Sequence, residues 1–172
     1  MTPPSIKLLT QDLLDDVAHQ SKLSPRLRKN YNFHELSERV QRFINVLQPG
    51  SYVRPHRHIR SADMNGFEFF LVLQGDIGIL IFDESGRVEY AERLTAQGSV
   101  RGIELAEGTY HTLIALAPDT VMLEMKEGPY SPSSDKEFLA AFPPEGSAEI
   151  YQLVADWERL FGVSCATGST IP

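Results

Sequence analysis

The sequence has one cysteine, Cys165, among its 172 residues. A single thiol excludes a disulfide within the chain, and the polar tail around Cys165 favours an incidental thiol over a catalytic nucleophile. No run approaches the roughly twenty apolar residues of a membrane helix. The first residues, Met-Thr-Pro-Pro-Ser, also lack the charged and apolar regions of a signal peptide. We therefore expect a cytoplasmic protein that does not bind membranes.

Basic side chains are outnumbered by acidic ones. Lysine and arginine number 16 and aspartate and glutamate 23, which gives a formal net charge of −7. This balance argues against nucleic acid as a partner, although a local basic cluster can still bind a small anion. Hydrophobic residues make up 42% of the chain, enough for one sizeable core, and we find no internal repeat or low-complexity tract.

Short β-favouring runs separated by turn residues fill the middle of the chain. One helix is expected to begin after the N-cap Thr10, and an amphipathic helix is expected over 148–161. The sequence thus predicts a mainly β domain at 25–142, a helical extension at 1–24, and a C-terminal helix and tail at 143–172. The expected strands cover 39–47, 51–58, 67–74, 77–82, 88–93, 101–105, 112–116 and 120–126.

Two of these runs, 67–73 and 77–82, are apolar on both faces. One face of such a strand lines the domain interior, and the other needs separate cover from a second sheet or a second subunit. The amphipathic C-terminal helix adds further apolar surface. We therefore expect a homodimer.

Three of the five histidines stand with a glutamate at a spacing that metal binding explains. Because residues two apart on a strand share a face, His56 and His58 project together. Glu68 and His111 supply two more donors from neighbouring runs. Imidazole nitrogens and a carboxylate suit a divalent transition metal, whether zinc, iron, nickel, manganese or copper. We predict one such ion, bound inside a β-barrel by His56, His58, Glu68 and His111.

The same blocks resemble the two motifs of the cupin superfamily, in which a glycine, His-x-His, a glutamate and a glycine precede a second block ending in histidine. The matching stretches are 50–58, 68–75 and 107–111, with a longer gap than usual, nine residues, between His58 and Glu68. The resemblance implies a cupin-type double-stranded β-helix, which is a jelly-roll barrel, with short N-terminal and C-terminal helices.

Four stretches, 25–34, 40–42, 47–58 and 124–130, resemble more narrowly the WbuC family of cupin-fold metalloproteins. The likeness covers roughly residues 8–142. It implies a metal-containing jelly roll that is often encoded among genes for bacterial surface-polysaccharide synthesis, without a settled reaction.

A metal ion with these four ligands keeps one or two positions open for water or substrate. We expect an isomerase-like metal-dependent enzyme that acts on a sugar, a sugar nucleotide or a related anionic hydroxy-carbonyl metabolite. Two alternatives stay open: a non-haem dioxygenase, which needs a redox metal, and a carbohydrate- or metabolite-binding protein without catalysis. His34 and Tyr110 are candidates for proton transfer, with local hydrogen bonding and packing as their respective structural alternatives.

Polar side chains occupy every second position of 26–34, which predicts a ligand-binding strand if this segment is extended. Two guanidinium groups, two amides and an imidazole suit a phosphate or carboxylate together with sugar hydroxyls. The alternative is an edge strand whose arginines face water. Glu124 and Lys126 share one face of their run, but the sequence does not determine which face. The predicted ligand-binding residues are Arg26, Arg28, Asn30, Asn32, His34, Lys126 and Tyr130.

Overall fold

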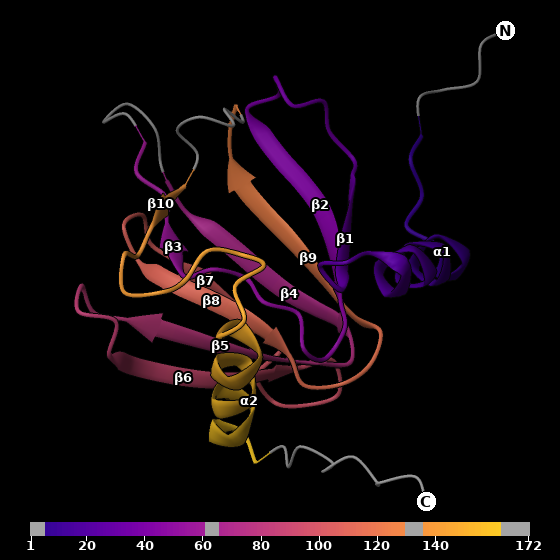
Figure 1. Cartoon of the computed structure of the whole chain (residues 1–172). Helices are drawn as coiled ribbons and strands as arrows, with labels where there is room; N and C mark the ends of the chain where they lie inside the picture. Colours follow the sequence, from indigo (N-terminus) through magenta and orange to yellow (C-terminus); the bar gives the residue numbers. More distant parts are fainter. Residues whose placement is uncertain (1–5, 61–65, 130–135, 163–172) are drawn as a thin grey trace, which may run out of the picture.

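The computed structural model describes residues 6–60, 66–129 and 136–162 (Figure 1). Two helices and ten strands lie within these ranges. In chain order they are α1 (Gln11–Leu23), β1 (Arg28–Asn32), β2 (Val40–Leu47), β3 (His56–Arg57), β4 (Glu68–Gln74), β5 (Asp76–Phe82), β6 (Val88–Thr95), β7 (Gly102–Leu105), β8 (Tyr110–Ala115), β9 (Thr120–Glu127), β10 (Glu137–Phe138) and α2 (Ile150–Leu160).

The strands form two five-stranded antiparallel sheets that enclose the interior (Figure 1). One sheet has the order β1-β2-β9-β4-β7, and the other has the order β10-β3-β8-β5-β6. The predicted mainly β jelly roll with a helix at each end is confirmed. No helix in the described ranges is long and apolar enough to cross a membrane.

Helix α1 covers the outer face of the first sheet. Its N-cap is Thr10, as predicted, and the Thr10 hydroxyl accepts a hydrogen bond from the Leu13 backbone N–H at 3.2 Å. The buried side chains of Leu14 and Val17 pack against an apolar cluster that β2 and β9 turn away from the interior. Ile44, Val46 and Val121 form that part of the cluster.

Helix α2 covers the outer face of the second sheet, where Trp157 stacks on Tyr52 with ring centroids 5.9 Å apart. Leu160, near the end of this helix, is 57% exposed. The two helices thus supply cover for the outer faces of the apolar strands, for which we expected a second sheet or subunit. The homodimer therefore stays a prediction.

Three features of the strands differ from the sequence-based expectation by more than a residue or two at an end. The run 51–58 forms only the short β3, in part because Pro55 has no N–H to donate to a neighbouring strand. The paired segment β10 was not predicted. Leu27 adopts a left-handed conformation with φ of 54°, so the extended segment begins at Arg28 and leaves Arg26 outside the strand.

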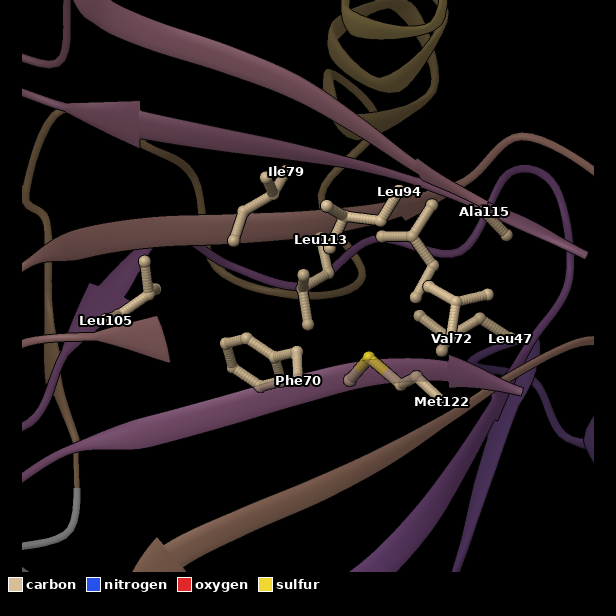
Figure 2. Close-up of a cluster of buried hydrophobic side chains, with 10 residues drawn as sticks. Leu47, Phe70, Val72, Ile79, Leu94, Leu105, Leu113, Ala115 and Met122 are labelled. Atoms are coloured by element: carbon tan, nitrogen blue, oxygen red, sulfur yellow. The ribbon is translucent and has the colours of Figure 1, made fainter. Parts of the chain in front are cut away.

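The core between the sheets is apolar at one end (Figure 2). Side chains from both sheets meet there, and Figure 2 shows Phe70 and Met122 from one sheet facing Leu113 and Ile79 from the other. The opposite end of the interior is lined by polar side chains, and it holds the candidate site. The apolar cluster consists of Leu47, Phe70, Val72, Ile77, Ile79, Leu94, Leu105, Leu113, Ala115 and Met122.

Candidate metal centre and ligand cavity

A cavity of about 420 Å³ opens at the polar end of the interior, and strands of both sheets line it. This size is typical of a site for a small molecule, for which cavities are about 300 to 1,000 Å³. The first sheet contributes Asn30, Phe43, Asn45, Glu68, Phe70, Met122, Glu124 and Lys126, and the second contributes His56, His111, Leu113 and Phe138.

The four predicted metal ligands are all buried, with exposed fractions between 2% and 5%. His56 and His111 are direct partners across β3 and β8, and their ring centroids lie 4.7 Å apart. The Glu68 carboxylate lies between two imidazoles: its Oε1 is 3.1 Å from His58 Nε2 and its Oε2 is 3.4 Å from His111 Nε2. Three of the four, His56, Glu68 and His111, line the cavity.

Backbone carbonyls fix the tautomers of two of these histidines. The Nδ1 atom of His56 is 2.9 Å from the Arg54 carbonyl oxygen, and that of His111 is 3.0 Å from the Thr109 carbonyl oxygen. Because a carbonyl only accepts, each Nδ1 carries the proton, and each Nε2 of a neutral ring keeps a lone pair for an ion. Burial lowers the pKa of His56 well below its ordinary value and also lowers the pKa of His111, so both rings are neutral at pH 7.

Glu68 supplies the negative charge of the cluster. Burial alone would raise the pKa of its carboxyl, but the hydrogen bond with His58 and the neighbouring His111 bring the pKa down to about 2. Glu68 is therefore ionised at neutral pH, as a carboxylate ligand must be.

The donor set fits a divalent ion in type, charge and spacing. Donors about 2.1 Å from one ion lie about 3.0 to 3.4 Å from each other at octahedral or tetrahedral angles. The two contacts of Glu68, at 3.1 and 3.4 Å, fall in that range. Among the residues that the structure describes, no group of three or more His, Cys, Asp or Glu side chains has the geometry of a completed metal site. The ion and its four ligands therefore stay a prediction, which these distances support.

The five residues of 26–34 that were predicted to bind a ligand all line the cavity: Arg26, Arg28, Asn30, Asn32 and His34. The arginines do not simply face water, because both contact the Glu145 carboxylate. Arg26 Nε lies 2.7 Å from Glu145 Oε2, and the Arg28 guanidinium donates to Glu145 and to the Tyr52 carbonyl. Substrate binding by this segment stays a prediction.

His34 is 5% exposed and presents a buried ring nitrogen at the cavity. Its Nδ1 accepts a hydrogen bond from the Arg42 backbone N–H at 2.9 Å, and the Arg42 carbonyl lies 2.8 Å from the same atom. Its Nε2 is buried and has no hydrogen-bond partner among the described residues. A buried polar atom of this kind is costly unless a ligand satisfies it.

Glu124 and Lys126 face the cavity, and their exposed fractions are 8% and 4%. The Asn45 amide donates a 2.7 Å hydrogen bond to Glu124 Oε2. Burial and the nearby charge of Glu68 raise the pKa of Glu124 to about 7, although Lys126 opposes the shift. We did not single out Glu124 as an acid or base from the sequence. The only signal was its two-residue spacing from Lys126 in a largely apolar run.

Tyr110 does not line the cavity, because it precedes His111 on β8 and points to the opposite face of the sheet. It packs in the cluster beneath α2. Its hydroxyl donates to Glu137 Oε1 at 2.7 Å, and the Arg57 guanidinium lies 4.4 Å above its ring. This placement favours the packing role over proton transfer. Tyr130 and Cys165 lie outside the described residues.

A family model described as a domain of unknown function, DUF6016, matches residues 9–94. The chain belongs to this family. The match to DUF6016 includes α1, the segment 26–34 and three of the four candidate metal ligands, His56, His58 and Glu68. No curated protein matches the chain.

Solved structures share the fold. The capsular polysaccharide assembling protein CapF from Staphylococcus aureus is 20% identical, with a TM-score of 0.52, over 67% of this chain and 32% of CapF. The salicylate 1,2-dioxygenase from Pseudoaminobacter salicylatoxidans, solved with gentisate, is 10% identical, with a TM-score of 0.51, over 70% and 33% of the two chains. A cupin superfamily protein from Desulfitobacterium hafniense is 17% identical over 58% and 76%, with a TM-score of 0.45.

The chain thus spans about a third of the length of CapF and of the dioxygenase. At these identities the likeness to CapF and to the dioxygenase concerns the fold alone, and it agrees with the jelly roll predicted from the sequence.

Proposed function

We propose that the protein is a metal-dependent cupin enzyme that transfers a proton on a small anionic hydroxy-carbonyl metabolite, such as a sugar or a sugar derivative. One observation carries the proposal. The buried carboxyl of Glu124 shares a cavity of about 420 Å³ with His56, Glu68 and His111. A titratable group beside the donors for a Lewis acid is the arrangement that proton transfer next to a carbonyl requires.

The ion would be held by His56, His58, Glu68 and His111, and when bound it supplies polarisation of a carbonyl or acidification of a hydroxyl. Glu124 moves the proton. Burial raises the pKa of its carboxyl and a bound cation lowers it again, so in the loaded protein the carboxylate can accept a proton from the substrate and, once protonated, return it. Asn45 orients this carboxyl by its hydrogen bond to Oε2.

Other lining residues suit a polar anionic ligand. The amides of Asn30 and Asn32 and the buried Nε2 of His34 offer hydrogen bonds to hydroxyl groups. Five lysine and arginine residues line the cavity against three carboxylates, an excess of positive charge in a chain with a net charge of −7. That excess favours a negatively charged ligand.

The wider biological setting is part of the same proposal. The sequence resemblance to the WbuC family supports a role in bacterial surface-polysaccharide synthesis. CapF, which is similar in fold, is named as a capsular polysaccharide assembling protein. We further propose that the protein acts in the cytoplasm as a homodimer.

The fold similarity to salicylate 1,2-dioxygenase supports the dioxygenase alternative. The cavity lining favours proton transfer, because charged and amide side chains there suit a sugar-like molecule better than an aromatic one. A binding protein without catalysis would use the same hydrogen-bonding groups but would not require a buried carboxyl group beside the metal donors.

Hydrogen exchange in deuterated water tests the proposal. Metal-loaded protein is incubated with a panel of keto-sugars, uronates and sugar phosphates, and deuterium at the carbon next to the carbonyl is followed by NMR. We expect exchange with at least one compound. Glu124→Gln should slow it about 100-fold or more while metal content stays unchanged.

Glu104→Gln is the matched control, because Glu104 is an exposed glutamate on β7. It should leave exchange intact. Oxygen uptake without deuterium incorporation would overturn the proposal in favour of a dioxygenase, and tight ligand binding without either reaction would overturn it in favour of a binding protein.

A further inference from the structure

A second hollow, of about 280 Å³, adjoins the metal cavity. Arg26, Arg28, Asn30 and Asn45 line both spaces, so the two meet beside β1 and β2. Ser24 and Lys29 complete the lining of the second hollow. Among the described residues that line it, three are cationic and none carries a carboxylate. This hollow is a strongly basic extension of the cavity in a chain that is acidic.

The charges in this region are balanced only in part. Glu145 contacts both Arg26 and Arg28, so two guanidinium groups share one carboxylate, and two positive charges face a ligand that displaces Glu145. Arginine stays charged even where burial lowers its pKa, as it does for Arg28. A phosphate monoester carries about 1.5 to 2 negative charges at pH 7 and three acceptor oxygens. It therefore matches this excess better than a single carboxylate does.

Arg28 is held in place independently of Glu145. Its side chain is 17% exposed, and its guanidinium also donates to the backbone carbonyl of Tyr52. Tyr52 is itself fixed, because its ring stacks on Trp157 and its hydroxyl donates to the Pro143 carbonyl at 2.8 Å. The guanidinium thus keeps its position when its carboxylate partner is exchanged, and such preorganisation favours anion binding.

Glu145, in contrast, stands on a surface segment. It lies between the end of the barrel and α2, outside any helix or strand, and its side chain is 37% exposed. The next residue, Gly146, has a φ of 88°, a conformation that glycine adopts readily. The Glu145 carboxylate can therefore leave the arginines without disturbing a packed element.

We propose that a phosphoryl subsite lies where the two spaces meet at Arg26 and Arg28, and that the Glu145 carboxylate, which lines the first cavity, occupies the anion position there until a ligand displaces it. This inference rests on the proposed function and narrows it: the substrate is a phosphate ester. Its carbohydrate part enters the metal cavity, and its phosphoryl group lies against Arg26 and Arg28. The phosphoryl group belongs either to a sugar monophosphate or to the diphosphate of a nucleotide sugar.

Calorimetric titration of the metal-free protein tests this subsite. The probes are inorganic phosphate, glucose 6-phosphate, glucuronate and uridine diphosphate glucose. Glu145→Gln removes the competing charge with little change in shape, and we expect phosphate to bind about tenfold more tightly. Arg26→Ala should weaken phosphate binding about tenfold, because it removes a charged hydrogen bond. Arg26 is largely exposed, so its loss should not prevent folding.

Asp83→Asn is the matched control. Asp83 is a carboxylate paired with the exposed Arg87 in the hairpin between β5 and β6, and neither residue lines either hollow. Its substitution should leave phosphate binding unchanged.

Unchanged or weaker phosphate binding by Glu145→Gln would overturn the role of Glu145. Glucuronate binding as tightly as glucose 6-phosphate would overturn the phosphoryl assignment. A preference for uridine diphosphate glucose over glucose 6-phosphate would support the subsite and identify its ligand as a diphosphate, whereas the reverse preference would support a monophosphate. These titrations use neither metal nor turnover, so they test the subsite separately from the reaction. Negative titrations would refute the phosphoryl subsite alone, and absence of proton exchange would refute the proposed reaction alone.

Discussion

The two ends of the barrel interior are built by the same strands and have opposite character. Along one face of each strand, polar residues at the cavity end give way to the apolar cluster in Figure 2. The inward residues are Glu68, Phe70 and Val72 on β4, His111, Leu113 and Ala115 on β8, and Lys126, Glu124 and Met122 on β9. The two-residue period decides which face a side chain occupies, and position along the strand decides which end of the interior it joins.

The two ends also differ in energetic role. Each fully buried aliphatic or aromatic side chain at the apolar end contributes about 1.5 to 3 kcal/mol to stability. Burial of an ionisable group at the polar end is unfavourable unless partners compensate it. The apolar end therefore stabilises the barrel, and the burial of ionisable groups at the polar end reduces that stability.

The largest effect on the free energy of unfolding is expected at the apolar end. Ile79 is fully buried there. Ile79→Ala should lower the free energy of unfolding by about 2 to 5 kcal/mol, since it removes apolar contacts and leaves a cavity. Ile79→Val is the milder control, at about 0.5 to 1.5 kcal/mol. Urea denaturation measures both variants. If Ile79→Ala lowered the free energy of unfolding by less than about 1 kcal/mol, the apolar end would not be the main source of stability.

At the polar end, Glu124 should make stability depend on pH. Its pKa in the folded protein is about 7, above the ordinary value of 4.5, so the unfolded chain releases this proton first. The contribution of the neutral carboxyl is complete below pH 4.5 and falls as pH rises to 7, by about 3 kcal/mol in total.

Glu124→Gln stays neutral and should lack this fall. Unfolding of both proteins is measured between pH 5 and 8 without metal, because a bound cation would itself lower the pKa. Parallel pH profiles for the two proteins would refute the assignment.

A smaller effect is expected at Asn45, the hydrogen-bond donor to Glu124. Asn45→Ala leaves the buried Oε2 atom without this donor and should cost about 1 to 2 kcal/mol. It should also raise the pKa of Glu124 further, since the hydrogen bond from Asn45 lowers it. Asn30→Ala is the control, because the exposed amide of Asn30 donates to Asn32 near the surface. Equal losses for the two variants would argue against a special role for Asn45.

Local patterns in the sequence account for much of the fold and for the four metal-ligand candidates. The two-residue spacing of His56 and His58 fixes their common face, and the glycines around the motifs mark the turns. The same parity separates Tyr110 from His111, so its packing role was also predictable. The facing of Glu124 was not, because β9 has apolar residues on both faces and either face could have turned inward.

Two other features of the structure could not be predicted from local sequence patterns. The left-handed conformation of Leu27 is unusual for a leucine, and it places Arg26 outside β1. The contact between Arg28 and Glu145 joins residues 117 positions apart. No periodicity encodes such a contact, since it arises only when the segment before α2 packs across the mouth of the barrel.

Substitution of a candidate metal-ligand histidine, His56, is expected to change the stability of the metal-free protein least and to reduce metal binding most. His56→Ala and His111→Ala each remove one imidazole from a cluster that is already crowded with polar groups. For His56→Ala the lost packing is offset by relief of that crowding, so the free energy of unfolding without metal should change by less than about 1 kcal/mol. His111→Ala should cost more, because His111 lies 3.4 Å from the buried Glu68 carboxylate and helps to compensate its burial. Metal content, measured by elemental analysis, should fall from about one ion per chain to near zero. The predicted site has four ligands, and each variant removes an imidazole whose Nε2 lone pair is oriented by the hydrogen bond of its Nδ1 to a backbone carbonyl. Full metal occupancy in the triple alanine variant of His56, His58 and His111 would refute the site. A stability loss in His56→Ala as large as that of Ile79→Ala would show instead that this histidine serves the fold.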